Sequence, residues 1–150
     1  MESRGRVQVN EACLIPYRLT TSGIQFCLVS TLVDNRWEFP KLLLPGEAES
    51  VAASLERLAD FLGIHGTVRA DEPLGYFAAA RGSESRTMTG YLMQVTDVDN
   101  EGPWREKYRR LWCLAEEARV RIRRKPLRRF IDLALHSEDV HSTAGALRTS

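Results

Sequence analysis

The sequence predicts a mixed α/β (α+β) domain, and three observations lead to this prediction. One stretch has helical periodicity, several shorter segments mix aromatic and β-branched residues, and turn-forming residues separate these segments. The chain has 150 residues, of which 43% are hydrophobic and 27% charged. These values are typical of a single globular domain with a hydrophobic core of its own.

The clearest helical signal runs from Glu49 to Leu62. Apolar residues recur along it at i, i+4, i+7 and i+11: Val51, Leu55, Leu58 and Leu62. This spacing puts them on one stripe of a helix, so we expect the stripe to lie against a sheet. Gly63 follows, and glycine enters the left-handed conformation at a helix end without a steric penalty. The helix is therefore predicted to end there.

Segments with strand character surround this helix. They are Glu11–Arg18, Ile24–Thr31, a short strand at Trp37, an edge strand near Thr67–Ala70, Leu74–Ala80, Thr87–Val98 and Arg110–Leu114. In Thr87–Val98 neither alternating face is polar throughout, which predicts packing on both sides. A short helix is expected from Ala115 and a final one from Leu127 to Leu135, with Pro126 in its first turn.

The polar ends of the sequence set the expected domain limits. Residues 1–8 are predicted to be frayed, residues 9–136 to form the domain, and residues 137–150 to be a disordered tail. No apolar run approaches the length of about 20 residues that crosses a membrane, and the first residues lack the apolar part of a secretory signal. Three widely spaced cysteines are expected to be reduced core residues, which points to the cytoplasm.

The residues around the central helix resemble the Nudix box of the Nudix hydrolases. The matching pieces are Phe39-Pro40-Lys41, Pro45-Gly46-Glu47, the leucine-bearing helix and Gly63-Ile64. This resemblance implies the Nudix fold, a mixed β-sheet sandwiched between helices, over roughly residues 8–136. It also implies cleavage of nucleoside diphosphates linked to another group, with Mg²⁺ or Mn²⁺ as the cofactor, and pairing into a homodimer. The segment Trp37–Lys41 is similar to that of the branch acting on diphosphoinositol and diadenosine polyphosphates.

The chain departs from the family pattern, which ends in Arg-Glu-apolar-x-Glu-Glu-x-Gly-apolar. Aligned at Gly63, the Arg-Glu pair falls on Glu56 and Arg57, so the charges are reversed, and the Glu-Glu pair falls on Asp60 and Phe61. A phenyl ring cannot coordinate a hard cation, and a guanidinium repels one. A register shifted by one residue would pair Glu56 with Asp60, but it would bury Arg57, so we prefer the first.

These positions give the candidate site. The metal candidates are Glu47, Glu56 and Asp60, of which Glu56 and Asp60 are also the catalytic candidates; the substrate-binding candidates are Lys41, Arg57 and Trp104. Arg57 could hold a phosphate in place of a metal. Each residue also has an ordinary structural explanation. Glu56 and Asp60 would then form a solvated helix face, Lys41 would lie on the surface, and Trp104 would cover the sheet edge.

Two functional hypotheses follow. The first is a Nudix-family protein with an eroded catalytic box and weak or no pyrophosphohydrolase activity, which binds a nucleotide or polyphosphate-type ligand with no metal required. The alternative is an active metal-dependent Nudix hydrolase of a nucleoside diphosphate-linked or polyphosphate substrate. Nothing in the sequence points to a membrane.

A basic segment stands apart from the box. Arg105–Arg129 contains eleven basic and three acidic residues, a net charge of +8 in a chain whose total is +1. Its last seven basic residues could contact a polyphosphate or a nucleic-acid backbone: Arg119, Arg121, Arg123, Arg124, Lys125, Arg128 and Arg129. No base-reading motif accompanies them, and a solvated basic face is the ordinary explanation.

Overall fold

The computed structural model describes residues 7–44 and 50–140. Its strands are β1 Val7–Thr20, β2 Gly23–Thr31, β3 Lys41–Leu43, β4 Ile64–Val68, β5 Gly75–Arg81, β6 Glu84–Val98 and β7 Tyr108–Leu114. Its helices are α1 Val51–Phe61, the short 3-10 helix η1 Pro103–Glu106, α2 Ala115–Arg121 and α3 Lys125–Leu135. None of the helices in these two described stretches is long and apolar enough to cross a membrane.

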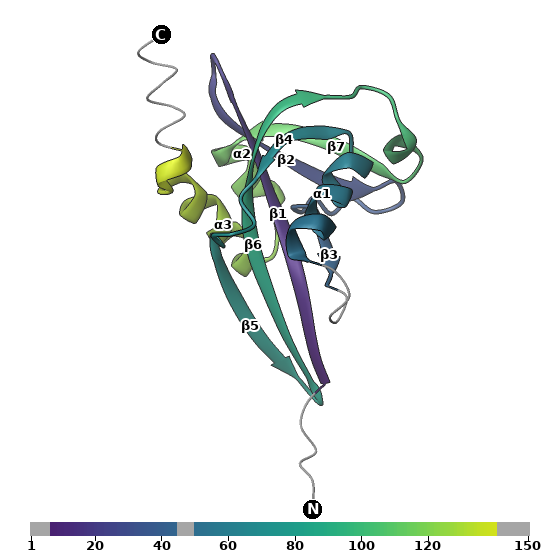
Figure 1. The fold of residues 1–150 in the computed structure, drawn as a ribbon, viewed down its shortest axis with the longest axis vertical. Helices are drawn as coiled ribbons and strands as arrows, with labels where there is room; N and C mark the ends of the chain where they lie inside the picture. Colours follow the sequence, from purple (N-terminus) through teal and green to yellow (C-terminus); the bar gives the residue numbers. More distant parts are fainter. Residues whose placement is uncertain (1–6, 45–49, 141–150) are drawn as a thin grey trace, which may run out of the picture.

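One mixed seven-stranded sheet organises the domain, with the order β4-β6-β1-β2-β7. The two long strands β1 and β6 run parallel at its centre, from the pair Val7 and Glu84 to the pair Tyr17 and Gln94. On its other edge β1 pairs first with β3 and then with β2, and β6 pairs first with β5 and then with β4. Strands β3 and β5 therefore lie beside the first halves of β1 and β6, and strands β2 and β4 lie beside their second halves (Figure 1).

Helices cover both faces of this sheet, α1 on one and α2 with α3 on the other (Figure 1). Alternate residues of a strand point to opposite faces. In β1, Leu14 belongs to the core under α1 and Ile15 to the core under α2 and α3. In β6, Met93 and Leu92 divide in the same way. The predicted packing on both sides of this strand is confirmed.

Helix α1 is set by local signals at both ends. The Ser50 side chain accepts a hydrogen bond of 3.1 Å from the backbone N–H of Ala53, which caps the first turn. Leu55 and Leu62 are fully buried, as the predicted stripe requires. Gly63 has φ +71°, the left-handed conformation expected of a residue that ends a helix.

Other elements differ from the sequence prediction. The strand predicted at Trp37 is a single bridge between Val29 and Glu38, because Pro40 has no N–H with which to extend the ladder. Strand β1 begins at Val7, inside the segment predicted to be frayed. The core extends to Val140, which is 1% exposed although residues from 137 were predicted to be a tail. Residues 141–150 lie outside the described part of the chain.

The three cysteines lie in the interior of the sheet. Cys13, Cys27 and Cys113 are free and buried. Burial raises the pKa of the Cys27 thiol to about 12 and that of Cys113 to about 11, and it raises the pKa of Cys13 further still. The thiols therefore stay protonated, and their prediction as structural core residues is confirmed.

Candidate functional site

Helix α1 presents two different flanks to the rest of the molecule. Successive residues of a helix are rotated by about 100°. Glu56 and Asp60, at i and i+4, therefore share one flank, and Arg57 and Phe61 share another. The first flank lines a cavity beside β4, and Phe61 on the second flank packs against Tyr108 of β7.

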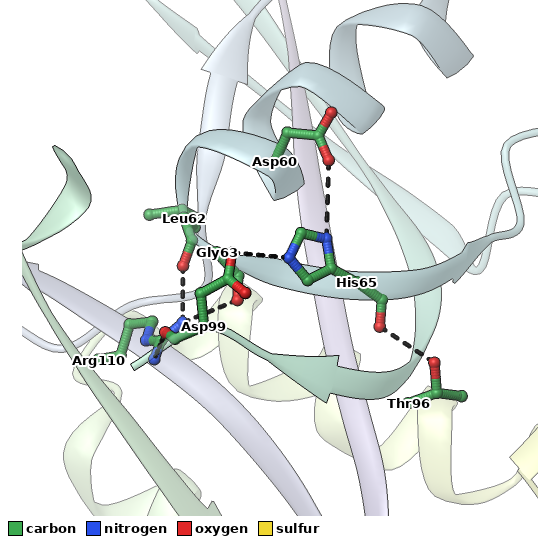
Figure 2. A network of polar contacts seen from close by, with 7 residues as sticks. All are labelled: Asp60, Leu62, Gly63, His65, Thr96, Asp99 and Arg110. Carbon is green, nitrogen blue, oxygen red and sulfur yellow. Dashed lines mark hydrogen bonds and ion pairs between the residues drawn. The ribbon is translucent and has the colours of Figure 1, made fainter. Parts of the chain in front are cut away.

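The flank of Glu56 and Asp60 faces β4. Both carboxylates line a cavity of about 310 Å³ together with His65. The His65 Nε2 lies 2.9 Å from a carboxylate oxygen of Asp99, and its Nδ1 lies 3.8 Å from one of Asp60 (Figure 2). The hydrogen bond to Asp99 raises the pKa of His65, and the charges of Asp99, Asp60 and Asp97 act in the same direction.

The carboxylates on this flank are two, and they stand without a third metal-ligating side chain among the described residues. Within residues 7–44 and 50–140, no three His, Cys, Asp or Glu side chains are placed to hold a metal ion. A hard cation is held by several oxygen ligands. On α1, one flank carries the carboxylates Glu56 and Asp60, and the other carries Arg57 and Phe61, which cannot act as ligands. Glu47, the third metal candidate, lies outside the described residues. The described part of α1 therefore offers a divalent ion two carboxylates, Glu56 and Asp60, and no third protein ligand beside them.

The flank of Phe61 faces β7. The Phe61 and Tyr108 rings meet edge to face, with centroids 6.1 Å apart and an interplanar angle of 82°. Tyr108 in turn lines a cavity of about 340 Å³ at the end of β2. The cavity opens to the surface and is lined by Val29, Ser30, Thr31, Asp34, Arg36, Glu38, Phe39, Lys41 and Tyr108. Lys41, a predicted substrate-binding residue, thus lies in the wall of this cavity.

The wall of this cavity beside Lys41 combines opposite charges with a fixed loop. The Lys41 ammonium lies 3.3 Å from a carboxylate oxygen of Glu38. Arg36 adds a second cation, and its backbone N–H donates to the Asp34 carboxylate at 3.1 Å. The Ser30 hydroxyl lies 3.0 Å from the carbonyl oxygen of Asp34, which ties this loop to β2. The cavity can therefore offer two cations to an anion without rebuilding its backbone.

Sequence reasoning missed Tyr108 and Arg36 as parts of this cavity. Tyr108 reaches the cavity because it is registered opposite Thr31 across β2 and β7. That register joins segments far apart in the sequence, and no local pattern marks it. Arg36 carried a local signal, since it lies in the segment that leads to Lys41.

Trp104 lies in the core under α1. Its ring is 8% exposed, and the Arg110 guanidinium covers one ring face at 3.8 Å from the centroid. Trp104 was a candidate for stacking on a ligand, and the geometry favours the alternative that it covers the sheet. The local sequence of the loop gave no sign of this burial, because η1 and its packing against β7 depend on tertiary contacts.

Arg110 fixes the C-terminal end of α1. One terminal nitrogen of its guanidinium donates to the carbonyl oxygens of Leu62 and Gly63 at 2.7 and 3.1 Å, and the other donates to that of Asp99 at 2.7 Å (Figure 2). Burial lowers its pKa. A cation here also meets the negative end of the helix dipole. Arg110 therefore positions α1, Asp99 and the ring of Trp104 relative to one another.

Comparison with known proteins identifies the fold. No protein-family model and no curated protein sequence matches the chain. Several solved structures, however, match the chain in fold. An Ap4A hydrolase of C. elegans, in a binary complex, is 15% identical with a TM-score of 0.62, covering 83% of this chain and 93% of its own. The ORF135 protein of E. coli is 15% identical with a TM-score of 0.63, covering 89% and 94%. A Nudix hydrolase structure from Listeria monocytogenes is 11% identical with a TM-score of 0.59, covering 81% and 88%. The mixed sheet between helices is the Nudix fold, as predicted.

Proposed function

We propose that this chain of Nudix fold is a Nudix-family protein that binds a nucleotide or polyphosphate-type ligand and has weak or no pyrophosphohydrolase activity. One observation carries the proposal. Arg57 and Phe61 stand at two of the three aligned positions where the family pattern has a glutamate, and the Phe61 ring packs against Tyr108, which lines the cavity. These two positions have no negative charge to hold a divalent ion, and the cavity lined by Tyr108 has the cations Lys41 and Arg36 beside the carboxylates Asp34 and Glu38.

The chemistry of the cavity supports a phosphorylated small molecule. Its volume of about 340 Å³ is within the range of small-molecule sites, roughly 300–1,000 Å³. Tyr108 supplies aromatic surface for a ring, and Lys41 and Arg36 supply cations for phosphate oxygens. A phosphate would replace Glu38 as the partner of Lys41. Binding of this kind uses protein donors and needs no metal.

Calorimetric titration with ADP, ATP and diadenosine tetraphosphate, each in Mg²⁺ and in EDTA, tests the proposal. We expect binding to persist in EDTA. Loss of one charge-assisted hydrogen bond costs about 1.5–3 kcal/mol, so Lys41→Ala should weaken binding by about tenfold to a hundredfold. Lys107→Ala is the matched control, because this exposed lysine precedes Tyr108 and does not line the cavity. Glu38→Gln should leave binding equal or tighter.

Equal losses of ligand affinity in the Lys41→Ala and Lys107→Ala variants would mean that only the net charge of the protein matters for binding. Titrations that show heat only in Mg²⁺ would contradict a ligand site that works without metal. Either result would remove the Tyr108 cavity as the site.

The second candidate is an active metal-dependent hydrolase, favoured by the placing of Glu56 and Asp60 in one cavity beside His65. Its test is phosphate release from the same nucleotides with Mg²⁺ or Mn²⁺. Turnover that disappears in Asp60→Ala and survives in Asp71→Ala, an exposed aspartate outside this cavity, would establish hydrolysis. Absence of turnover is the result expected from the first proposal.

A reducing compartment such as the cytoplasm suits the protein, because its three cysteines are free and buried.

A further inference from the structure

The turn between α2 and α3 carries a concentration of positive charge. Within Arg123–Arg129 the sequence has five basic residues and no acidic one. We call this group the basic corner; it consists of Arg123, Arg124, Lys125, Arg128 and Arg129. Four of the five side chains are exposed, and Arg128 is half-buried. The group covers the turn and the first turn of α3.

The structure separates the basic corner from the other cations of Arg105–Arg129. Arg105, Arg119 and Arg121 form ion pairs with Glu101, Asp132 and Glu117 respectively. Arg109 donates to the carbonyl oxygen of Leu32, and Arg110 holds the end of α1. In the described residues, no side chain of the basic corner has an ion pair or a hydrogen bond. Apart from the exposed Lys107, which precedes β7, the cations of Arg105–Arg129 without such a contact in the described residues are therefore the five of the basic corner.

Folding does not account for these five charges. The N-terminal end of a helix is electropositive and favours acidic residues. Helix α2 follows this rule, with Glu116 and Glu117 in its first turn and Arg119 and Arg121 in its last. Helix α3 has no acidic residue in its first turn, and Arg124 at its N-cap makes no side-chain hydrogen bond. The basic corner therefore lowers the stability of the helix that carries it, through both the dipole and mutual repulsion.

The surroundings define the kind of partner. Neither cavity described above is lined by residues of the basic corner, so these cations are separate from both candidate small-molecule sites. Phe130, the aromatic residue within α3, is 1% exposed and cannot stack on a base. No exposed apolar side chain interrupts Arg123–Arg129 to enter a lipid surface. Four of the five cations are arginines, whose fork suits phosphate oxygens.

We propose that the basic corner binds the phosphate backbone of a nucleic acid without reading its bases. This surface is separate from the Tyr108 cavity, so the proposal does not depend on the proposed small-molecule ligand. The proposal assigns a role to five cations that form no ion pair in the described residues and that do not stabilise α3. It also sets a limit on salt dependence, because each neutralised phosphate releases counterions. For five contacts the slope of log K against log salt is at most about −4.5 on duplex DNA and about −3.5 on a single strand.

The experiment is fluorescence anisotropy with labelled single-stranded and duplex oligonucleotides of mixed sequence, between about 50 and 200 mM salt. The triple variant Arg123→Gln, Arg124→Gln and Arg129→Gln is compared with Arg105→Gln, Arg119→Gln and Arg121→Gln. Both lose the same net charge, but the second set removes arginines that are already ion-paired. We expect at least a tenfold loss of affinity and a flatter salt slope in the first variant, and less than a threefold loss in the second.

Stability and ligand controls complete the test. The basic-corner variant should unfold at the same temperature as the parent or higher at low salt, because repulsion at the start of α3 is relieved. Lys41→Ala should leave oligonucleotide binding unchanged. Equal losses in the two triple variants, tenfold discrimination between oligonucleotide sequences, or binding to phosphatidylserine vesicles in preference to either oligonucleotide would each overturn the proposal.

Discussion

A single glycine fixes the place where α1 gives way to β4. Gly63 has φ +71°, which side chains rarely adopt. A Cβ at this position would also lie 3.0 Å from the indole nitrogen of Trp104 and 3.2 Å from a terminal nitrogen of Arg110. Both the backbone conformation and the surrounding side chains therefore select glycine.

Gly63→Ala should lower the free energy of unfolding by more than Gly82→Ala. Gly82 also has a positive φ, +58°, but a Cβ there would meet nothing within 4 Å. The control variant therefore carries only the backbone penalty, about 1–2 kcal/mol, and Gly63→Ala adds close contacts worth about 1–3 kcal/mol. Urea denaturation of both variants measures the difference. Equal losses would mean that Trp104 and Arg110 move aside freely.

At the scale of elements, a histidine joins the start of β4 to the end of α1 and to the residue after β6. His65 lies between Asp60 of α1 and Asp99. The backbone carbonyl oxygen of Asp99 also accepts a hydrogen bond from the Arg110 guanidinium, and the Asp99 N–H donates to the carbonyl oxygen of Gly63 at 2.7 Å. The ion pairs of His65 therefore reinforce a junction that backbone hydrogen bonds already hold.

Stability should depend on pH through this histidine. The folded-state pKa of His65 is raised, chiefly by its hydrogen bond to Asp99. Its contribution is therefore fully present below the unfolded pKa, about 6.5, and is lost as pH rises through the folded value. Asp99→Asn should lower the His65 pKa measured by NMR and flatten this dependence. Asp60→Asn should have a smaller effect, since Asp60 makes only a longer-range contribution. A His65 pKa unchanged in Asp99→Asn would contradict the assignment.

Elements with local signals were predictable from the sequence, and elements set by distant pairing were not. The stripe of α1 with Gly63, and the two-faced pattern of β6, are both properties of contiguous residues. Trp37 carries strand character, but Pro40 and the register with β2 leave one bridge there. Of the candidate site, Lys41 was found because it lies in a motif. Tyr108 was missed because only the pairing of β7 with β2 brings it to Lys41.

At the scale of the whole molecule, the end of the described chain closes the core. Val140 is 1% exposed and belongs to the cluster under α2 and α3. Nearby, Arg69 at the end of β4 donates to the Asp139 carboxylate at 2.9 Å. The residues after α3 thus join the core under α2 and α3 to Arg69, which follows the edge strand β4. The folded domain therefore extends beyond residue 136, the limit predicted from the sequence.

Val140→Ala should destabilise the whole domain. Removing two buried methyl groups costs about 2 kcal/mol, with a further cavity contribution where the site cannot relax. Val120→Ala makes the same chemical change on α2 at a side chain that is 82% exposed, and it should shift the free energy of unfolding by less than about 0.5 kcal/mol. Thermal and urea unfolding of the two variants check this. A negligible effect at Val140 would show that the core ends at α3.

The parallel pairing of β1 with β6 has a consequence for biosynthesis. Strand β1 is made first, yet its longest partner begins only at Glu84. While the ribosome is still adding the intervening residues, β1 can pair only with β2 and β3, and its edge toward β6 remains open. Contacts so distant in sequence form slowly and expose strand edges meanwhile. The nascent chain should therefore need its strongest protection from aggregation before Val98 leaves the exit tunnel.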